Sequence, residues 1–406
     1  MVSSHQRAML LVNTLATCIA CALVLAGAIQ SVALGCDPGN ASQALGFIVY
    51  EQRLPWPAPN HAVIKRAFVQ THPERLAATS GEVLFQSDND EGIAEFRIAP
   101  TQDCLLSAIN TSVPWNTSTN DLWLISLGKG SNKKITADNA GYRNLEWSSD
   151  GSLISYISNE GASQGSGDTS GQVPANLYAY DAETGKQKRL LQQTVSSRWL
   201  PGNRLLAATS HGKQGLFLLD PDSGKQITIL QNAKGGYLAV SPDGRLLAWV
   251  YDNHLAIIAS PMKAAQLRIP TSWKSVQSVN PSYVPEQFSF SPDGTLLALT
   301  LPVFGANIRL PRQLTILRTM DGKVGLLGTV LGVPRHLRWS LDGQSVVFVR
   351  GTYGPEFVLH LSSVALGEPQ YRSSTAVDWT NHDQARVSEL VQFPPGSEYI
   401  DWVESE

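Results

Sequence analysis

The stretch 239–249, with the sequence AVSPDGRLLAW, decides the fold. A short apolar strand ends at Ser241, a tight turn follows, and a second apolar strand leaves the turn. Proline at the second turn position presets φ, and glycine suits the fourth, which is the preference of a type I turn. The strand after the turn is apolar without alternation, which predicts burial on both faces between neighbouring sheets.

The same pattern recurs along the chain. Three further strong copies are 146–156 (EWSSDGSLISY), 289–299 (SFSPDGTLLAL) and 338–348 (RWSLDGQSVVF), and weaker ones lie near Asp103, Gly202 and Asp383. Successive turns are about 41 to 52 residues apart, close to the spacing of propeller blades. A second hairpin, with Gly185, Gly224 or Gly322 in its turn, follows several copies. Each repeat therefore has four strands, which is one blade of a β-propeller.

The strong copies resemble the TolB-type, WD-repeat-like propeller repeat, in which an aromatic residue precedes Ser-Pro-Asp-Gly and an aliphatic strand. Ser149 and Leu341 stand where that family has proline. The resemblance covers about residues 81–406 and implies a fold, with residues 37–80 left as a poorly patterned N-terminal segment. Seven turns predict a single all-β propeller of seven blades, with six or eight as alternatives. We expect a strand at 47–50 or 83–86 to complete the last blade, because joining the chain ends removes an open edge.

The first 36 residues have a different composition. Arg7 precedes a long apolar run from Ala8 to Leu34, and no acidic residue occurs before Asp37. This pattern predicts a signal sequence or a membrane anchor helix that sends the rest of the chain across the membrane. The segment 33–36 resembles the bacterial lipobox, with its first two residues in reversed order of size, which makes Cys36 a lipidation candidate. An anchor helix, a lipoprotein and a cleaved signal are the three alternatives, and we expect the protein at the cell membrane on its extracytoplasmic side, periplasmic or extracellular.

Composition limits the classes of function. The net charge is −3 with 16% charged residues and no long basic run, which argues against nucleic-acid binding. No H-E-x-x-H and no paired C-x-x-C motif occurs, and the histidines are scattered, so we expect no metal and no cofactor. The turn residues Asp150, Asp243, Asp293 and Asp342 are expected to bond to local backbone. The aromatic residues before the turns are expected to pack between blades, and these are Trp147, Trp199, Phe290, Trp339 and Trp379.

Long connections are expected to share one face of the ring, at 111–120, 159–175, 270–286 and 302–312, opposite the short turns. Loops on a rigid scaffold commonly carry binding residues, and aromatic residues and arginine are favoured at interfaces. The candidate binding residues in these loops are Trp115, Trp273, Lys274, Tyr283, Phe304, Arg309 and Arg312. The sequence favours a membrane-tethered module that binds or scaffolds a protein or a cell-envelope polymer. The alternatives are a hydrolase, lyase or cyclotransferase with its site at the mouth of the central tunnel, and a sensory or structural part of a larger envelope assembly.

Overall fold

The computed structural model is all-β in the part of the chain that it describes. These residues are 46–53, 62–68, 74–75, 81–86, 92–110, 119–128, 130–159, 175–209, 214–232, 235–251, 254–259, 287–302, 312–321, 323–331, 334–353, 357–367, 371–372, 385–393 and 397–404. No helix in these ranges has the length and hydropathy that crossing a bilayer requires. The N-terminal signal or anchor, Cys36 and the weak repeat at 377–383 lie outside the described residues.

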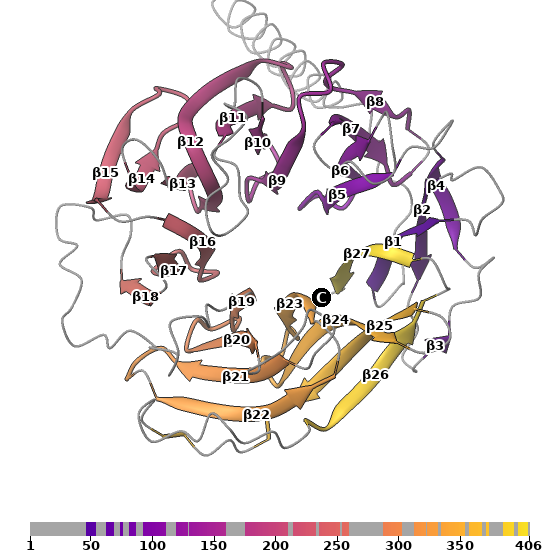
Figure 1. Cartoon of the computed structure of the whole chain (residues 1–406). Helices are drawn as coiled ribbons and strands as arrows, with labels where there is room; N and C mark the ends of the chain where they lie inside the picture. The colour runs from indigo at the N-terminus through magenta and orange to yellow at the C-terminus, as the bar shows by residue number, and fades with distance from the viewer. Residues whose placement is uncertain are drawn as a thin grey trace, which may run out of the picture.

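The described strands form six hydrogen-bonded sheets around a central axis, and the seven-stranded sheet comprises two blades, so the ring has seven blades (Figure 1). From the axis outward, blade 1 comprises β27 (Ser397–Glu404), β1 (Gly46–Arg53), β2 (Ala62–Phe68) and β4 (Glu82–Gln86). Blade 2 comprises β5 (Ile93–Ile98), β6 (Cys104–Asn110), β7 (Asn120–Ser126) and β8 (Lys133–Lys134). Blade 3 comprises β9 (Tyr142–Trp147), β10 (Leu153–Ser158), β11 (Ala175–Asp181) and the first part of β12 (Gln187–Leu200), and blade 4 comprises the last part of β12, β13 (Arg204–Thr209), β14 (Gly215–Leu219) and β15 (Gln226–Gln231). Blade 5 comprises β16 (Gly235–Val240), β17 (Leu246–Tyr251) and β18 (His254–Ala259). Blade 6 comprises β19 (Gln287–Phe290), β20 (Leu296–Pro302), β21 (Arg312–Arg318) and β22 (Val324–Val330). Blade 7 comprises β23 (Arg335–Trp339), β24 (Ser345–Tyr353), β25 (Phe357–Ala365) and β26 (Val387–Gln392), with β3 (Glu74–Arg75) outside β26. The predicted seven-bladed propeller is confirmed.

The two ends of the chain close the ring in blade 1. The C-terminal strand β27 is its innermost strand and pairs antiparallel with β1, from Gly46 opposite Glu404 to Gln52 opposite Ser397. Both N-terminal segments that were expected to close the ring belong to this blade, because 47–50 lies in β1 and 83–86 lies in β4. Because β27 pairs with β1, the two ends of the chain are joined in one sheet and the inner edge of β1 is not left open.

The repeated turns have one hydrogen-bonding scheme. In the turn after β16, the Ser241 hydroxyl donates to Oδ1 of Asp243 at 2.6 Å, the Arg245 N–H donates to the same oxygen, and the Leu246 N–H donates to Oγ of Ser241. The equivalent bonds occur around Asp150, Asp293 and Asp342. The glycine after each aspartate has φ between 68° and 74°, in the left-handed region that glycine adopts at little cost. The expectation that these carboxylates bond to local backbone is confirmed.

Apolar side chains from neighbouring blades form the core between them. One cluster joins Leu106 and Leu122 of blade 2 to Ile154 and Tyr156 of blade 3, and the other clusters join further neighbouring pairs in the same way. Strands in the middle of a blade are therefore covered on both faces, as the unbroken apolar runs predict. The core fixes the inner strands of adjacent blades side by side around the axis (Figure 1).

Candidate functional site

One position on the inner strands recurs from blade to blade. It lies four residues before the residue that begins the turn, and it is occupied by Glu95, Asn144, Ser196, Tyr237, Gln287 and His336. At or beside this position the register of the inner strand shifts in blades 2, 3, 4, 5 and 7. Such bulges release backbone groups from the ladder and redirect side chains. Asn144 and His336 both have φ of 53°, so the distortion is alike on opposite sides of the ring.

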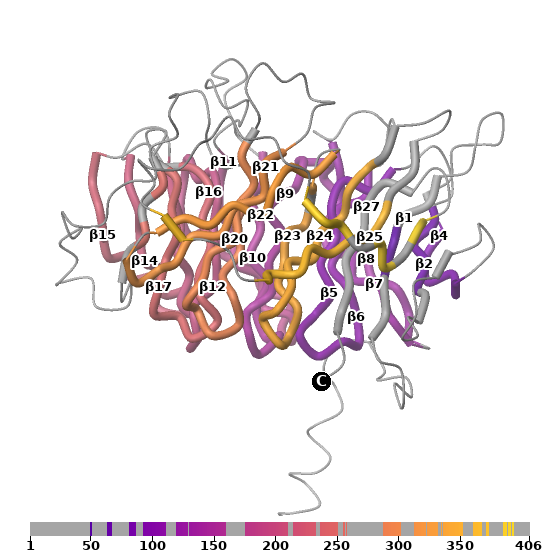
Figure 2. The backbone as a smooth tube through the Cα atoms, turned by 90° about the horizontal axis from the view of Figure 1, so that it is seen from below, coloured from indigo at the N-terminus to yellow at the C-terminus, as the bar shows by residue number. Residues whose placement is uncertain are grey.

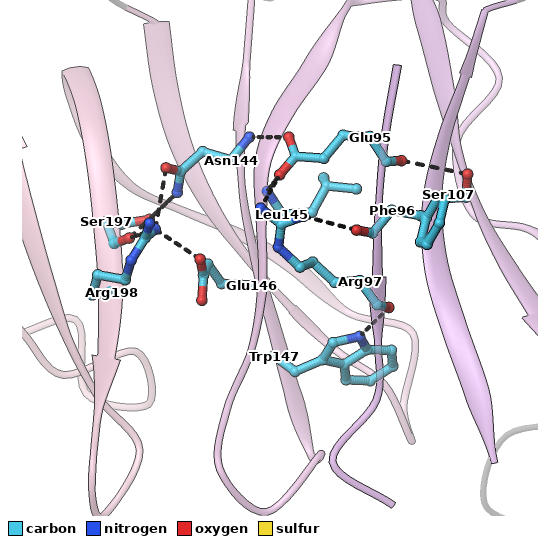
Figure 3. Close-up of polar contacts among 10 residues, drawn as sticks. All are labelled: Glu95, Phe96, Arg97, Ser107, Asn144, Leu145, Glu146, Trp147, Ser197 and Arg198. Carbon is cyan, nitrogen blue, oxygen red and sulfur yellow. Dashed lines mark hydrogen bonds and ion pairs between the residues drawn. The ribbon is translucent and has the colours of Figure 1, made fainter. Parts of the chain in front are cut away.

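Glu95 of blade 2 bonds to the bulge of blade 3 (Figure 3). Its Oε2 accepts from the Asn144 N–H at 2.8 Å, and its Oε1 accepts from the Leu145 N–H at 3.3 Å. The guanidinium of Arg97 lies 3.0 Å from Oε1 of the same carboxylate. Glu95 thus satisfies two backbone donors that the bulge leaves without a partner in their own sheet.

The electrostatic surroundings of Glu95 act in opposite directions. Burial raises the pKa of the carboxyl above its ordinary value, and the nearby Glu146 adds to this rise. The charge of Arg97 and the two backbone N–H groups lower the pKa, but the net shift is upward. A buried carboxyl with a raised pKa is a feature of catalytic acids, and it also occurs in structural networks.

The network continues from blade 3 to blade 4 (Figure 3). The Asn144 amide donates to Oγ of Ser197 at 3.0 Å, and Arg198 forms an ion pair with Glu146 at 2.7 Å. Arg198 also donates to the Ser197 carbonyl at 2.9 Å. The side chain at the recurring position therefore again reaches the inner strand of the next blade.

Two further blade pairs repeat the contact with other residue types. The Ser196 hydroxyl donates to the Gly236 carbonyl of blade 5 at 2.6 Å. The amide oxygen of Gln287 accepts from the Leu337 N–H of blade 7 at 3.1 Å, which is the bond that Glu95 makes to Leu145. Four polar side chains at the recurring position thus tie one inner strand to the next.

The indole rings of the tryptophan residues before the turns form a second kind of hydrogen bond between neighbouring inner strands. Nε1 of Trp147 donates to the Arg97 carbonyl at 3.1 Å, and Nε1 of Trp339 donates to the Ser289 carbonyl at 2.9 Å. Trp199 makes the corresponding bond to the Glu146 carbonyl at 3.4 Å. Phe290 packs in the core cluster that joins blades 5 and 6. The prediction that these residues pack between blades is confirmed for these four, and Trp379 lies outside the described residues.

The candidate binding residues fall mostly outside the described residues. These are Trp115, Trp273, Lys274, Tyr283, Phe304 and Arg309. Arg312 begins β21, opposite Pro302, and its side chain is buried. The described residues contain no cluster of three or more potential metal ligands. The inner-strand network was not found from the sequence, because its recurring position is occupied by six different residue types.

Comparison with known proteins identifies the fold. No protein-family model and no curated protein matches this sequence. Among solved structures, the chain is similar to a protein from Lactobacillus plantarum, with a TM-score of 0.53 and 12% identity over 88% of this chain and 99% of that one. It is also similar to the periplasmic gluconolactonase PpgL of Pseudomonas aeruginosa, with a TM-score of 0.51 and 11% identity over 88% and 99% of the two chains. TolB from Acinetobacter baumannii matches with a TM-score of 0.44 and 16% identity over 85% and 67%. At these identities the similarity shows the propeller fold alone.

Proposed function

We propose that this protein is an extracytoplasmic, membrane-tethered β-propeller that binds or scaffolds a protein or a cell-envelope polymer. The observation that carries the proposal is that the acidic side chains of two inner strands bond neighbouring blades to each other. Both carboxylates on β5 and β9, Glu95 and Glu146, are bonded to the next blade. These groups hold the ring together and leave it as a rigid frame for its loops.

The binding face in this proposal is the one that carries the long connections. The short turns are closed by their own hydrogen bonds, such as Ser241 to Asp243 and the Gly185 N–H to the Asp181 carbonyl, and they lie together at one end of the strands (Figure 2). Blades 2, 3, 4 and 6 each present two such short turns, whereas the connection between the two outer strands is longer in blade 1 (69–81) and in blade 7 (366–386). The connections of variable length are the part of the chain in which a specific partner can be recognised.

A capture experiment with residues 37–406 tests the proposal. Deletion of 303–311 or of 270–286 is expected to abolish retention of the partner from a membrane extract. The matched control is Arg245→Ala, which changes a side chain 82% exposed on the short-turn face and is expected to leave retention unchanged. Retention of every partner by both deletion variants would exclude this face.

Membrane fractionation tests the tether. If Cys36 carries the lipid, Cys36→Ser is expected to move the protein out of the detergent-soluble membrane fraction. If residues 8–34 remain as a helix, this variant stays in the membrane, and only deletion of 1–36 releases the protein. Recovery of the unaltered chain in the soluble periplasmic fraction would contradict a tether of either kind.

One observation favours the second function, an enzyme with a site near the axis. The pKa of Glu95 is raised by burial, and the carboxyl lies on the innermost layer of the ring. If Glu95 were a general acid, Glu95→Gln would abolish turnover of envelope polysaccharides or lactones without unfolding the ring. Under the binding proposal, the variant keeps the captured partner.

A further inference from the structure

The strand β12 serves two blades without a turn between them. Its residues 187–194 pair with β11 as the outer strand of blade 3, and 194–200 pair with β13 as the inner strand of blade 4. Every strand has two edges for hydrogen bonding. At 187–193 one edge is taken by β11, and no strand in the described part of the chain pairs with the other. Within the described ranges, blade 3 therefore ends in a backbone edge that no other strand pairs with.

A cavity of about 380 Å³ lies beside this edge, between blades 3 and 4. Its lining residues are Arg189, Leu190, Leu191, Gln192 and Gln193 on one side, and Thr209, Phe217 and Gln226 on the other. Successive side chains of a strand point to opposite faces. Five consecutive residues of β12 line this cavity because the strand is irregular here: its register with β11 shifts on both sides of Leu191, and Gln193 has φ of 58°.

One lining residue, Thr209, lies beside a fully buried hydroxyl that is not itself part of the cavity lining. Thr209 lines the cavity and lies opposite Thr194 in the register of β12 and β13. Directly opposed residues of an antiparallel pair have their side chains on the same face. The Thr194 hydroxyl is fully buried and has no hydrogen-bond partner among the described residues.

In blades 6 and 7 other segments of the chain cover part of the outer edge, whereas β4, β8 and β15, like β12, have no outer partner in the described part of the chain. In blade 7, β3 pairs parallel to β26 as a fifth strand, with Glu74 opposite Val391 and Arg75 opposite Gln392 (Figure 1). In blade 6, Arg372 bridges to Val324, and the Ala385 N–H donates to the Thr329 carbonyl. The architecture thus accepts an added strand on the outside of a blade, and uncovered edges are the usual template for strand addition.

We propose that the outer edge of β12 at residues 189–193 is a docking site for an extended peptide of a partner protein, which adds to blade 3 as a fifth strand. The backbone groups of the edge supply the pairing, and the cavity accepts alternate side chains of the peptide. Arg189 is exposed and has no ion pair in the described part of the chain, which selects a peptide that carries a carboxylate near its middle. The exposed amides of Gln192, Gln193 and Gln226 offer hydrogen bonds along the rest of the groove.

The test uses synthetic peptides of about eight residues that alternate Thr and Val and carry one Glu, placed at a different position in each peptide. Binding to residues 37–406 is measured by fluorescence polarisation up to about 1 mM peptide. The best peptide is then made in two N-methylated forms, one methylated at odd and one at even positions. Since only alternate residues of a strand donate to a given neighbour, one form is expected to lose binding and the other to keep it.

Two protein variants complete the test. Arg189→Glu is expected to weaken binding by about tenfold or more, and Arg245→Glu, on the short-turn face, is expected to have no effect. Amide hydrogen exchange at 189–193 is expected to be fast in the free protein and to slow when the peptide binds.

Four results would overturn the proposal. They are failure of all peptides to bind, equal binding by both methylated forms, no effect of Arg189→Glu, and slow exchange at 189–193 in the free protein, which would mean that another segment of this chain already covers the edge. This edge is separate from the face with the long connections. A negative result here leaves the loop-deletion experiment unaffected, and the converse also holds.

Discussion

At the scale of single residues, Glu95 and Gln287 fill equivalent positions in two blades with different chemistry. Both accept a backbone N–H from the next inner strand, but Glu95 accepts two and also lies 3.0 Å from the guanidinium of Arg97. Glu95→Ala is expected to cost about 2–4 kcal/mol in the free energy of unfolding, because two partly buried N–H groups lose their acceptor. Glu95→Gln is expected to cost about 1 kcal/mol, since the amide oxygen keeps one of the bonds. Urea unfolding of both variants measures the difference, and equal losses would contradict this role.

The raised pKa of Glu95 predicts how stability depends on pH. In the unfolded chain the carboxyl ionises at its ordinary pKa, whereas in the folded ring it retains its proton to higher pH. The contribution of Glu95 to the free energy of unfolding is therefore present at low pH, and it is lost as the pH rises through the pKa that Glu95 has in the folded protein. The melting temperature of the unaltered protein relative to Glu95→Gln is expected to fall as the pH rises above the ordinary glutamate pKa of about 4. A difference that rises over this range would mean that the ion pair with Arg97 dominates.

At the scale of the strands and turns, the tryptophan before the turn ties one inner strand to the previous one. Trp339→Phe is expected to keep the packing and lose the bond to the Ser289 carbonyl, at a cost of about 1 kcal/mol. The chain already has phenylalanine at this position in blade 6, as Phe290. Trp339→Ala also removes the packing and is expected to cost about 3–5 kcal/mol. Chemical unfolding of the two variants separates the contributions, and a Phe variant as unstable as the Ala variant would contradict the assignment.

What the sequence predicts at this scale depends on whether the interaction is local. The turn at Asp243 was predictable, because the carboxylate bonds to groups within two residues of it. The tie between Glu95 and Leu145 was not, because it joins residues 50 positions apart and any acceptor can make it. The continuity of β12 had a signal that was overlooked, since no glycine or proline interrupts 187–200. The candidate residues in the long connections remain predictions, apart from the buried position of Arg312.

At the scale of the whole molecule, pairing of β27 with β1 closes the ring. Removal of 397–406 would leave β1 without its inner partner and open the contact of β27 with β5. The melting temperature is expected to fall by at least about 10 °C, and the protein to associate through the exposed edge. Removal of 405–406 alone is the control and is expected to change neither. Thermal melts with size-exclusion chromatography measure both effects, and an unchanged monomer without β27 would contradict closure by this strand.

The central claim is that a partner binds the face of the ring that carries the long connections. The measurement that tests it most directly is amine crosslinking of the full chain in its membrane, followed by mass spectrometry of the linked peptides. Lys274 lies in the long segment 270–286, whereas Lys225 and Lys323 are exposed in the short turns. The account predicts links to the partner from Lys274 and none from Lys225 or Lys323. Links from the two short-turn lysines with none from Lys274 would contradict it.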